Sequence, residues 1–184
     1  MDLKLCFSHD AKDAPPGEGA GEEGCDWSSE EAQLIKAQLS KIRNWRMKLS
    51  DLWKVANICA SSTREYKSGG ILFWGRHFAS QEHAFQYVKS HHEDFTLESR
   101  SDMAWDPELA QRVGNQRWKP TQEVVKRFYR EIMLARFTQA KDCREVLLAT
   151  GNARLCLWVS SASIGYSAAS HMRVRDELRK LDKK

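Results

Sequence analysis

Residues 78–90 read FASQEHAFQYVKS and set acidic, basic and amide side chains among apolar ones. Ser80 is placed to cap a helix that begins just after it. In a helix over residues 81–89, Glu82, Gln86 and Lys89 fall at positions i, i+4 and i+7, so they share one face. The stretch therefore predicts an amphipathic helix whose buried side is made by Ala84, Phe85, Tyr87 and Val88.

Two interpretations of the polar face follow from this spacing. Glutamate and lysine at such intervals are common on solvated helix faces, so spacing alone favours an ordinary surface helix. As a functional face, the carboxylate and the amide would hold a ribose. A desolvated lysine could then act as a nucleophile toward the C1 carbon of the sugar.

Length and composition describe an ordinary globular protein. The 184 residues fit one domain with an added arm and suffice to bury a core. Hydrophobic residues make up 41% and charged residues 29%, which argues against a disordered or fibrous chain. The net charge of +4 is spread along the chain, so it neither requires nor excludes a phosphate-bearing partner.

The sequence carries no membrane or secretion signal. No stretch approaches the roughly 20 apolar residues that cross a bilayer. The N-terminus MDLKLCFSHDAKDAP has acids where a signal peptide has a basic end and an apolar run. We therefore expect an intracellular, cytoplasmic protein without a membrane partner. The cysteines are scattered and form no CxxC pair, so we expect reduced thiols and no zinc.

The first third of the chain divides by composition. Residues 1–27 include DAKDAPPGEGAGEEGCD, which is rich in acids, glycine and proline and predicts a flexible tail. Residues 28–60 predict an amphipathic helix with a stripe of large apolar side chains at Ile35, Leu39, Ile42, Trp45, Leu49 and Leu52. Such a stripe must dock on its own domain or on a protein partner, which Trp45, Trp53 or Trp105 would meet.

The remainder, residues 61–184, predicts one helix-rich domain. ILFWGRHF suits a short strand or hairpin, and a helix from Pro107 should end near Gly114. Helices are also expected in TQEVVKRFYREIMLARFTQ, before Gly151, and in the basic C-terminal segment. The histidines near Lys89 lack HExxH spacing, so no metal is expected. Trp74 and its aromatic neighbours could stack a nucleobase.

Three segments in order resemble the NADAR family of domains. They are ASQEHAFQYVKS, then DPELAQRVGNQRWKPTQEVVKRFYREIMLARFTQAKDCREVLLATGNARL, then MRVRDEL, and together they span about residues 70–178. EHAFQ, ARFTQ and LLATG stand in the family's order and at its spacing. On these motifs the chain is identified as a divergent member of that family.

The resemblance implies an α+β, predominantly helical, single compact domain, here with an extra N-terminal amphipathic helix. It also implies an N-glycosidase acting on an ADP-ribosyl or ribosyl-phosphate bond, with no cofactor and with nucleic acid only as a modified substrate. By motif position, Glu82 is the acidic catalytic residue and Lys89 the amine that takes the sugar as a Schiff base. The substrate-binding residues would be Gln86, His83, Trp74, Arg112, Gly114 and Gly165.

Two family motifs are altered in this chain. Where active members carry DxxWG, the run SSASIGYSAAS puts Ser161 at the acid and Ile164 at the tryptophan. The family's FSNFYP start is only faintly matched by KLSDLWK. Two hypotheses therefore stay open: a glycosidase in which another acid, Asp102 or Asp106, replaces the missing one, or a catalytically degenerate binding or scaffold subunit of a larger complex.

Overall fold

The protein has an α+β, mostly helical fold that divides into two compact units. The computed structural model describes residues 3–8, 14–58, 66–90, 106–117, 121–157 and 166–183. One unit combines Met1–Ser50 with Lys141–Lys184, and the other is the continuous segment Asp51–Ala140. The predicted division at residues 27 and 60 is not tested by this grouping and stays a prediction. Among the described residues, no helix is both long and apolar enough to cross a membrane.

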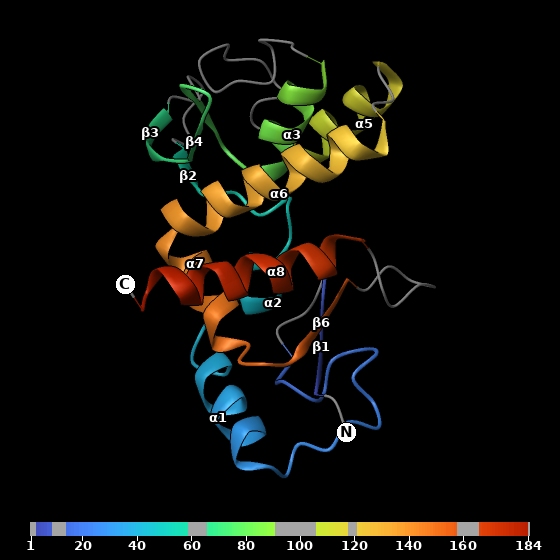
Figure 1. Ribbon diagram of the computed structural model, residues 1–184, viewed down its shortest axis with the longest axis vertical. Coiled ribbons are helices and arrows are strands. Elements are labelled where there is room, and N and C mark those ends of the chain that lie inside the picture. Colours follow the sequence, from blue (N-terminus) through green and yellow to red (C-terminus); the bar gives the residue numbers. More distant parts are fainter. Residues whose placement is uncertain are drawn as a thin grey trace. The chain divides into compact units, whose positions relative to one another are not determined.

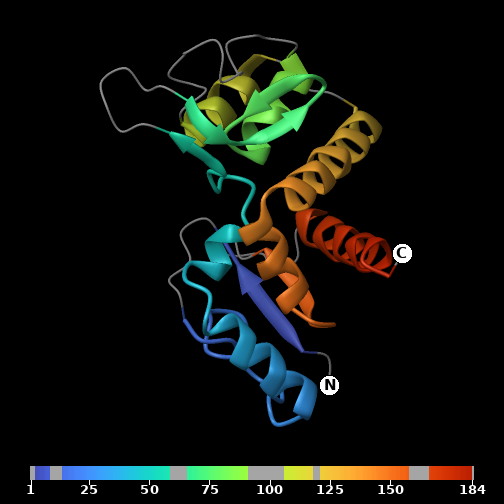
Figure 2. The ribbon, with the colours of Figure 1, turned by 90° about the vertical axis from the view of Figure 1, so that its left-hand side faces the viewer.

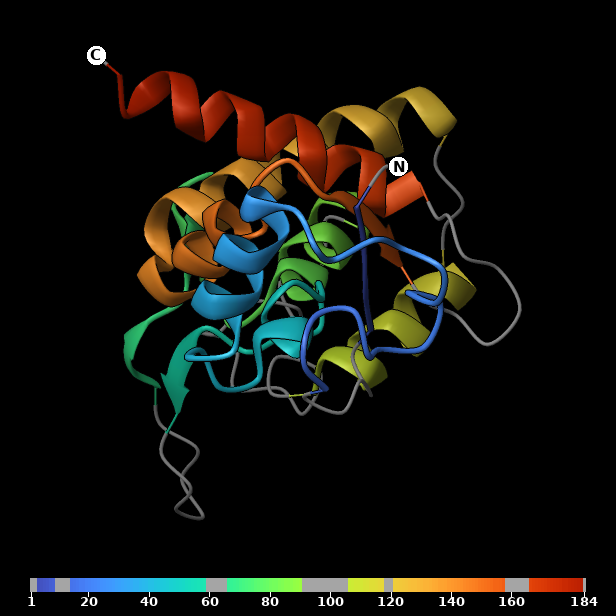
Figure 3. The same ribbon diagram turned by 90° about the horizontal axis from the view of Figure 1, so that it is seen from below.

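The discontinuous unit is built around two parallel strands from distant parts of the chain. Strand β1 (Lys4–Phe7) pairs with β6 (Arg154–Leu157), with Lys4 opposite Arg154 and Cys6 opposite Cys156. Helices α1 (Glu30–Leu39), α2 (Trp45–Lys48), α7 (Lys141–Ala149) and α8 (Tyr166–Leu181) complete the unit (Figure 1). Helix α1 lies beside α7 (Figure 3), and α8 packs on both β6 and α7.

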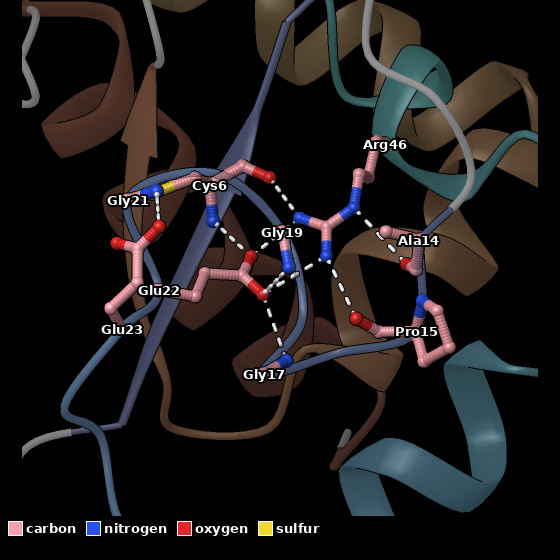
Figure 4. Close-up of polar contacts among 9 residues, drawn as sticks. All are labelled: Cys6, Ala14, Pro15, Gly17, Gly19, Gly21, Glu22, Glu23 and Arg46. Atoms are coloured by element: carbon pink, nitrogen blue, oxygen red, sulfur yellow. Dashed lines mark hydrogen bonds and ion pairs between the residues drawn. The ribbon is translucent and has the colours of Figure 1, made fainter.

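The N-terminal segment differs from the flexible tail that its composition predicts. Glu22 and Arg46 are both buried and form an ion pair (Figure 4). Glu22 also accepts hydrogen bonds from the backbone N–H groups of Cys6 at 2.7 Å and Gly17 at 2.8 Å. A Cβ on Gly19 would lie 2.5 Å from the Arg46 guanidinium, so glycine is needed there. Composition misses this order because a single buried ion pair organises the loop.

The predicted helix over residues 28–60 is broken. Ser29 caps α1, which ends at Leu39, and α2 follows Asn44, whose φ of 58° lies in the left-handed region. That backbone conformation is incompatible with one continuous helix and turns the chain. The apolar face of α1 docks within its own unit through Ala32, Ile35 and Leu39. Trp45 is likewise part of that unit's core, which removes it as a partner-facing residue.

The continuous unit combines two antiparallel strand pairs with three helices. Strand β2 (Ala56–Ile58) pairs with β3 (Tyr66–Gly69), and β4 (Ile71–Phe73) pairs with β5 (Arg76–Phe78). Trp74 and Gly75 both have positive φ, the geometry of a tight two-residue hairpin turn. The helices are α3 (Gln81–Ser90), α5 (Pro107–Arg117) and α6 (Gln122–Gln139).

The core of this unit lies between the β4–β5 hairpin and the helices. The hairpin packs on α3 (Figure 2), and α6 contacts both α3 and β4 (Figure 1). The buried apolar residues at this contact are Ile71, Phe73, Phe78, Ala84, Val88 and Ile132. The hairpin and the helices of residues 81–89 and 122–139 are thus confirmed. The helix from Pro107 does not stop near Gly114 but runs to Arg117.

Candidate functional site

The face of α3 that carries Glu82, Gln86 and Lys89 is buried. Their exposed fractions are 3%, 1% and 7%, so the interpretation as an ordinary surface helix is wrong. Helices α5 and α6 both pack on α3. Spacing alone could not distinguish the two cases, because it gives the direction of a side chain and not what covers it.

Two hydrogen bonds fix the start of α3. The Ser80 hydroxyl accepts a hydrogen bond from the His83 N–H at 3.2 Å, which is the predicted capping role. The Glu82 N–H donates to the backbone oxygen of Asp51 at 3.1 Å. Glu82 is therefore held at the first turn of the helix and next to the segment that opens this unit.

Glu82 is surrounded in a way that keeps its carboxyl group protonated. Burial raises its pKa to about 8, and the negative charge of Asp51 adds to this shift. Two neighbours oppose it: Gln86, whose side-chain amide donates to Glu82 Oε1 at 2.5 Å, and the charge of Lys89. At neutral pH the acid form therefore predominates, and Glu82 is able to donate a proton.

Lys89 is shifted in the opposite direction. Desolvation lowers the pKa of its ammonium group, while the charge of Glu82 acts to raise it. Its Nζ lies 5.9 Å from the centre of the Phe85 ring. An acid with a raised pKa and an amine with a lowered pKa on one face are suited to proton donation and nucleophilic attack.

Gly114 allows α5 to approach α3 closely. A Cβ at this position would lie 1.8 Å from Gln86 Oε1, so no other residue fits without displacing Gln86. The structure thus joins Gly114 to the group formed by Glu82, Gln86 and Lys89. The resemblance placed Gly114 on the substrate side, and the contact shows that it lies against one of the predicted site residues.

The other predicted site residues lie in different surroundings. His83 is fully buried next to Glu82 in sequence. Trp74 is 52% exposed at the hairpin turn, with its ring stacked on Phe73. Arg112 is exposed on α5. Gly165 lies outside the described residues, as do Ser161 and Ile164.

Sequence reasoning missed Asp51 and Tyr129. The Tyr129 hydroxyl, on α6, donates to Asp51 Oδ2 at 2.6 Å. Asp51 lies in the weakly matched KLSDLWK run, and its proximity to α3 depends on the fold, so only that faint match could have indicated it.

Two acids were expected as replacements for the missing one. The first, Asp102, lies outside the described residues, as does Trp105, which was expected to meet a partner. Asp106 is exposed and caps α5 through the N–H groups of Glu108 and Leu109.

The described residues contain no group of three or more histidine, cysteine, aspartate or glutamate side chains arranged to hold a metal ion. The absence of a metal or cofactor stays a prediction. The buried face of α3 carries an acid, Glu82, and a potential nucleophile, Lys89.

Comparison with known proteins shows a likeness at the level of fold. No model of a known protein family matches the sequence, and no curated protein matches it. The NMR structure of the E. coli protein YbiA is similar, with a TM-score of 0.55 and 20% sequence identity, over 100% of this chain and 89% of that one. The alignment takes in the whole chain, so it does not mark residues 28–60 as an addition. The chain therefore has a fold like that of YbiA, as its resemblance to the NADAR, or YbiA-like, family predicts.

Proposed function

We propose that the protein is a divergent N-glycosidase that cleaves an ADP-ribosyl or ribosyl-phosphate N-glycosidic bond. The observation that supports this most directly is the buried face of α3, where the pKa of Glu82 is raised to about 8 and that of Lys89 is lowered. An ordinary ion pair between the two would shift both values the other way. The shifts instead favour the neutral form of each group relative to its state in water.

The reaction would use these two groups in sequence. Glu82 donates its proton to the leaving base as the C1–N bond breaks and the base takes the bonding electrons. Lys89 Nζ bonds to C1, and the proton that it then releases returns to the Glu82 carboxylate. Water later hydrolyses the sugar–lysine linkage, which frees the sugar and restores the amine. The net reaction consumes one water molecule.

The remaining predicted residues would hold the substrate. Gln86 orients the Glu82 carboxyl group through its 2.5 Å hydrogen bond. Lys89, the most exposed of the three on α3, marks the C-terminal part of that face as the side from which a sugar would enter. Trp74 offers a flat aromatic surface to a base, and Arg112 offers a cation to phosphate. We retain His83, Gly114 and Gly165 as substrate-side residues by resemblance.

The altered motifs support a second candidate function. Serine at position 161 cannot act as an anionic base, and isoleucine at 164 cannot stack a base. Leu34, on the outer side of α1, is 57% exposed. A catalytically degenerate binding or scaffold subunit with a protein partner on the N-terminal helix is the alternative that these features favour.

The first experiment incubates the protein with ADP-ribosylated guanosine, and separately with a ribosylated pyrimidine phosphate, and detects the released base by mass spectrometry. We expect release by the parent, and its loss in Glu82→Gln and Lys89→Met. Lys141→Met, at an exposed position, is the matched control and should retain activity. Borohydride reduction during turnover should attach the sugar to Lys89. A folded parent that releases neither base would contradict the enzyme and favour the scaffold.

A further inference from the structure

We propose that Asp51 is the second acid of the site and forms a carboxyl pair with Glu82, with Tyr129 fixing the position of Asp51. This inference rests on the proposed glycosidase for its catalytic meaning. The carboxyl pair itself is a physical property that can be measured without a substrate. It also replaces the expectation that Asp102 or Asp106 supplies the missing acid.

Asp51 is held from two directions. Its backbone oxygen accepts from the Glu82 N–H at 3.1 Å, which ties it to the first turn of α3. Its Oδ2 accepts from the Tyr129 hydroxyl at 2.6 Å, which ties it to α6. Tyr129 is itself buried and packs edge-on against Phe85, with ring centres 5.6 Å apart. The backbone of Asp51 is thus held by α3 and its carboxyl group by α6.

The charge of Asp51 acts on Glu82. Burial is the largest cause that raises the pKa of Glu82, and the negative charge of Asp51 is the second. Gln86 and Lys89 are the groups that oppose them. Two carboxyl groups near one another cannot both ionise at low cost, so one of them keeps a proton. Glu82 is the group whose pKa is raised, so Glu82 keeps its proton at neutral pH.

The effect passes from Glu82 to Lys89. A charged Glu82 raises the pKa of Lys89 and so favours an ammonium group, which cannot attack a sugar. A neutral Glu82 removes that opposition and leaves desolvation to lower the pKa of Lys89. Asp51 therefore acts on both reacting groups: it favours the protonated form of Glu82, and through Glu82 it favours the neutral form of Lys89.

Asp106 does not fit this role. It is exposed at the start of α5, and its Oδ1 is occupied by the N–H groups of Glu108 and Leu109. That is the usual environment of a helix cap. Asp106 thus provides a matched control: an aspartate of the same unit whose charge should leave Glu82 unaffected.

The test is a pH titration of the carboxyl carbons by NMR, using protein labelled in its aspartate and glutamate side chains. In the parent, the Glu82 signal should titrate near pH 8. In Asp51→Asn, which keeps an oxygen to accept from Tyr129, the midpoint should fall by at least about one unit, a tenfold change in the proton's binding constant. Asp106→Asn should leave it unchanged. A Glu82 midpoint that is the same in the parent and in Asp51→Asn would overturn the proposal.

A second variant guards against a poorly folded Asp51→Asn. Asp51→Glu keeps the negative charge, so the Glu82 midpoint should stay near pH 8 in that variant. A midpoint as low as that of Asp51→Asn would show that the charge at position 51 does not act on Glu82, which would equally overturn the pair.

Activity separates the failure of this inference from that of the proposed function. If the parent releases base, Asp51→Asn should lower kcat at pH 7.5 by about threefold or more with little change in KM, and the alkaline limit of activity should move down with the NMR midpoint. An active Asp51→Asn with the parent's pH profile would contradict the role of Asp51. An inactive parent would refute the glycosidase, and the NMR titration would still decide whether the pair exists.

Discussion

The two units each bury a glutamate on a helix or loop, and the two carboxyl groups are placed in opposite surroundings. Glu22 faces the Arg46 guanidinium and the backbone N–H groups of Cys6, Gly17 and Gly19. Glu82 faces a second carboxylate, an amide and a lysine whose pKa is lowered. Both side chains are at most 3% exposed. Burial alone therefore does not determine what a carboxyl group does, because its partners decide whether it holds a loop in place or stores a proton.

The largest expected effect comes from breaking the Glu22–Arg46 pair. Arg46→Met would leave a buried carboxylate without its cation and remove the bonds from Arg46 to the 14–15 backbone. We expect a loss of about 3–5 kcal/mol in the free energy of unfolding, measured by urea denaturation. Arg43→Met, on the exposed turn just before Asn44, is the control. The double variant Glu22→Gln/Arg46→Met should recover part of this loss. If Arg46→Met loses only about 1 kcal/mol or less, as expected for an exposed ion pair, the Glu22–Arg46 pair does not stabilise the fold.

The next effect concerns the close approach of α5 and α3. Gly114→Ala places a Cβ where Gln86 Oε1 now lies, so either the helices separate or Gln86 moves. We expect a loss of about 1–3 kcal/mol in the free energy of unfolding. The pKa of Glu82 should also rise further, because the Gln86 hydrogen bond lowers it.

Shortening the residue opposite Gly114 provides the control. In Gln86→Ala/Gly114→Ala the added methyl group has room, so the double variant should cost less than the sum of the single ones. Strictly additive costs would mean that the two residues do not compete for the same space.

The third effect is the contribution of Glu82 to the dependence of stability on pH. The folded-state pKa of Glu82 is about 8, above the ordinary value of 4.5, so the unfolded state loses this proton first as pH rises. Its contribution is therefore fully present below pH 4.5 and is lost up to pH 8, by at most about 1.4 kcal/mol per pH unit. Glutamine does not titrate, so urea denaturation of the parent and of Glu82→Gln at several pH values should give curves that lie closest below pH 4.5 and separate as the pH rises toward 8. Parallel curves would contradict the raised pKa.

The smallest effect is expected at an acid outside the buried group. Asp106→Ala removes the cap of α5 and should cost about 1 kcal/mol of stability. Thermal unfolding measures this loss. The NMR midpoint of Glu82 should be the same as in the parent. A shifted midpoint would show that the charge of Asp106 acts on the Glu82 carboxyl group.

The helices that could be predicted from the sequence are those with a regular apolar period. Residues 122–139 carry such a pattern, and α6 has these bounds. The hairpin followed from ILFWGRHF, since β-branched and aromatic residues flank a glycine turn. These features depend on residues near one another in the chain, which is why local patterns are enough to find them.

Features that depend on distant residues could not be found in this way. The β1–β6 pair joins Lys4 to Arg154, and each strand is too short to show a period. The Glu22–Arg46 pair ordered a loop that composition assigned to a tail. At the site, the motifs predicted Glu82, Gln86 and Lys89, but the burial of their face and the neighbouring Asp51 appear only once α3, α5 and α6 are packed together.

The pairing of β1 with β6 has a consequence for how the protein is made. Asp51–Ala140 is continuous, so all of it has been synthesised before Arg154 is added, whereas β1 has no partner until that point. At roughly 5–20 residues per second, the ribosome needs on the order of ten seconds to travel from one strand to the other. During that interval Leu5 and Phe7, which end fully buried, lie on an unpaired strand. Strand β1 is therefore the segment that a chaperone would need to shield, and the discontinuous unit is the last to close.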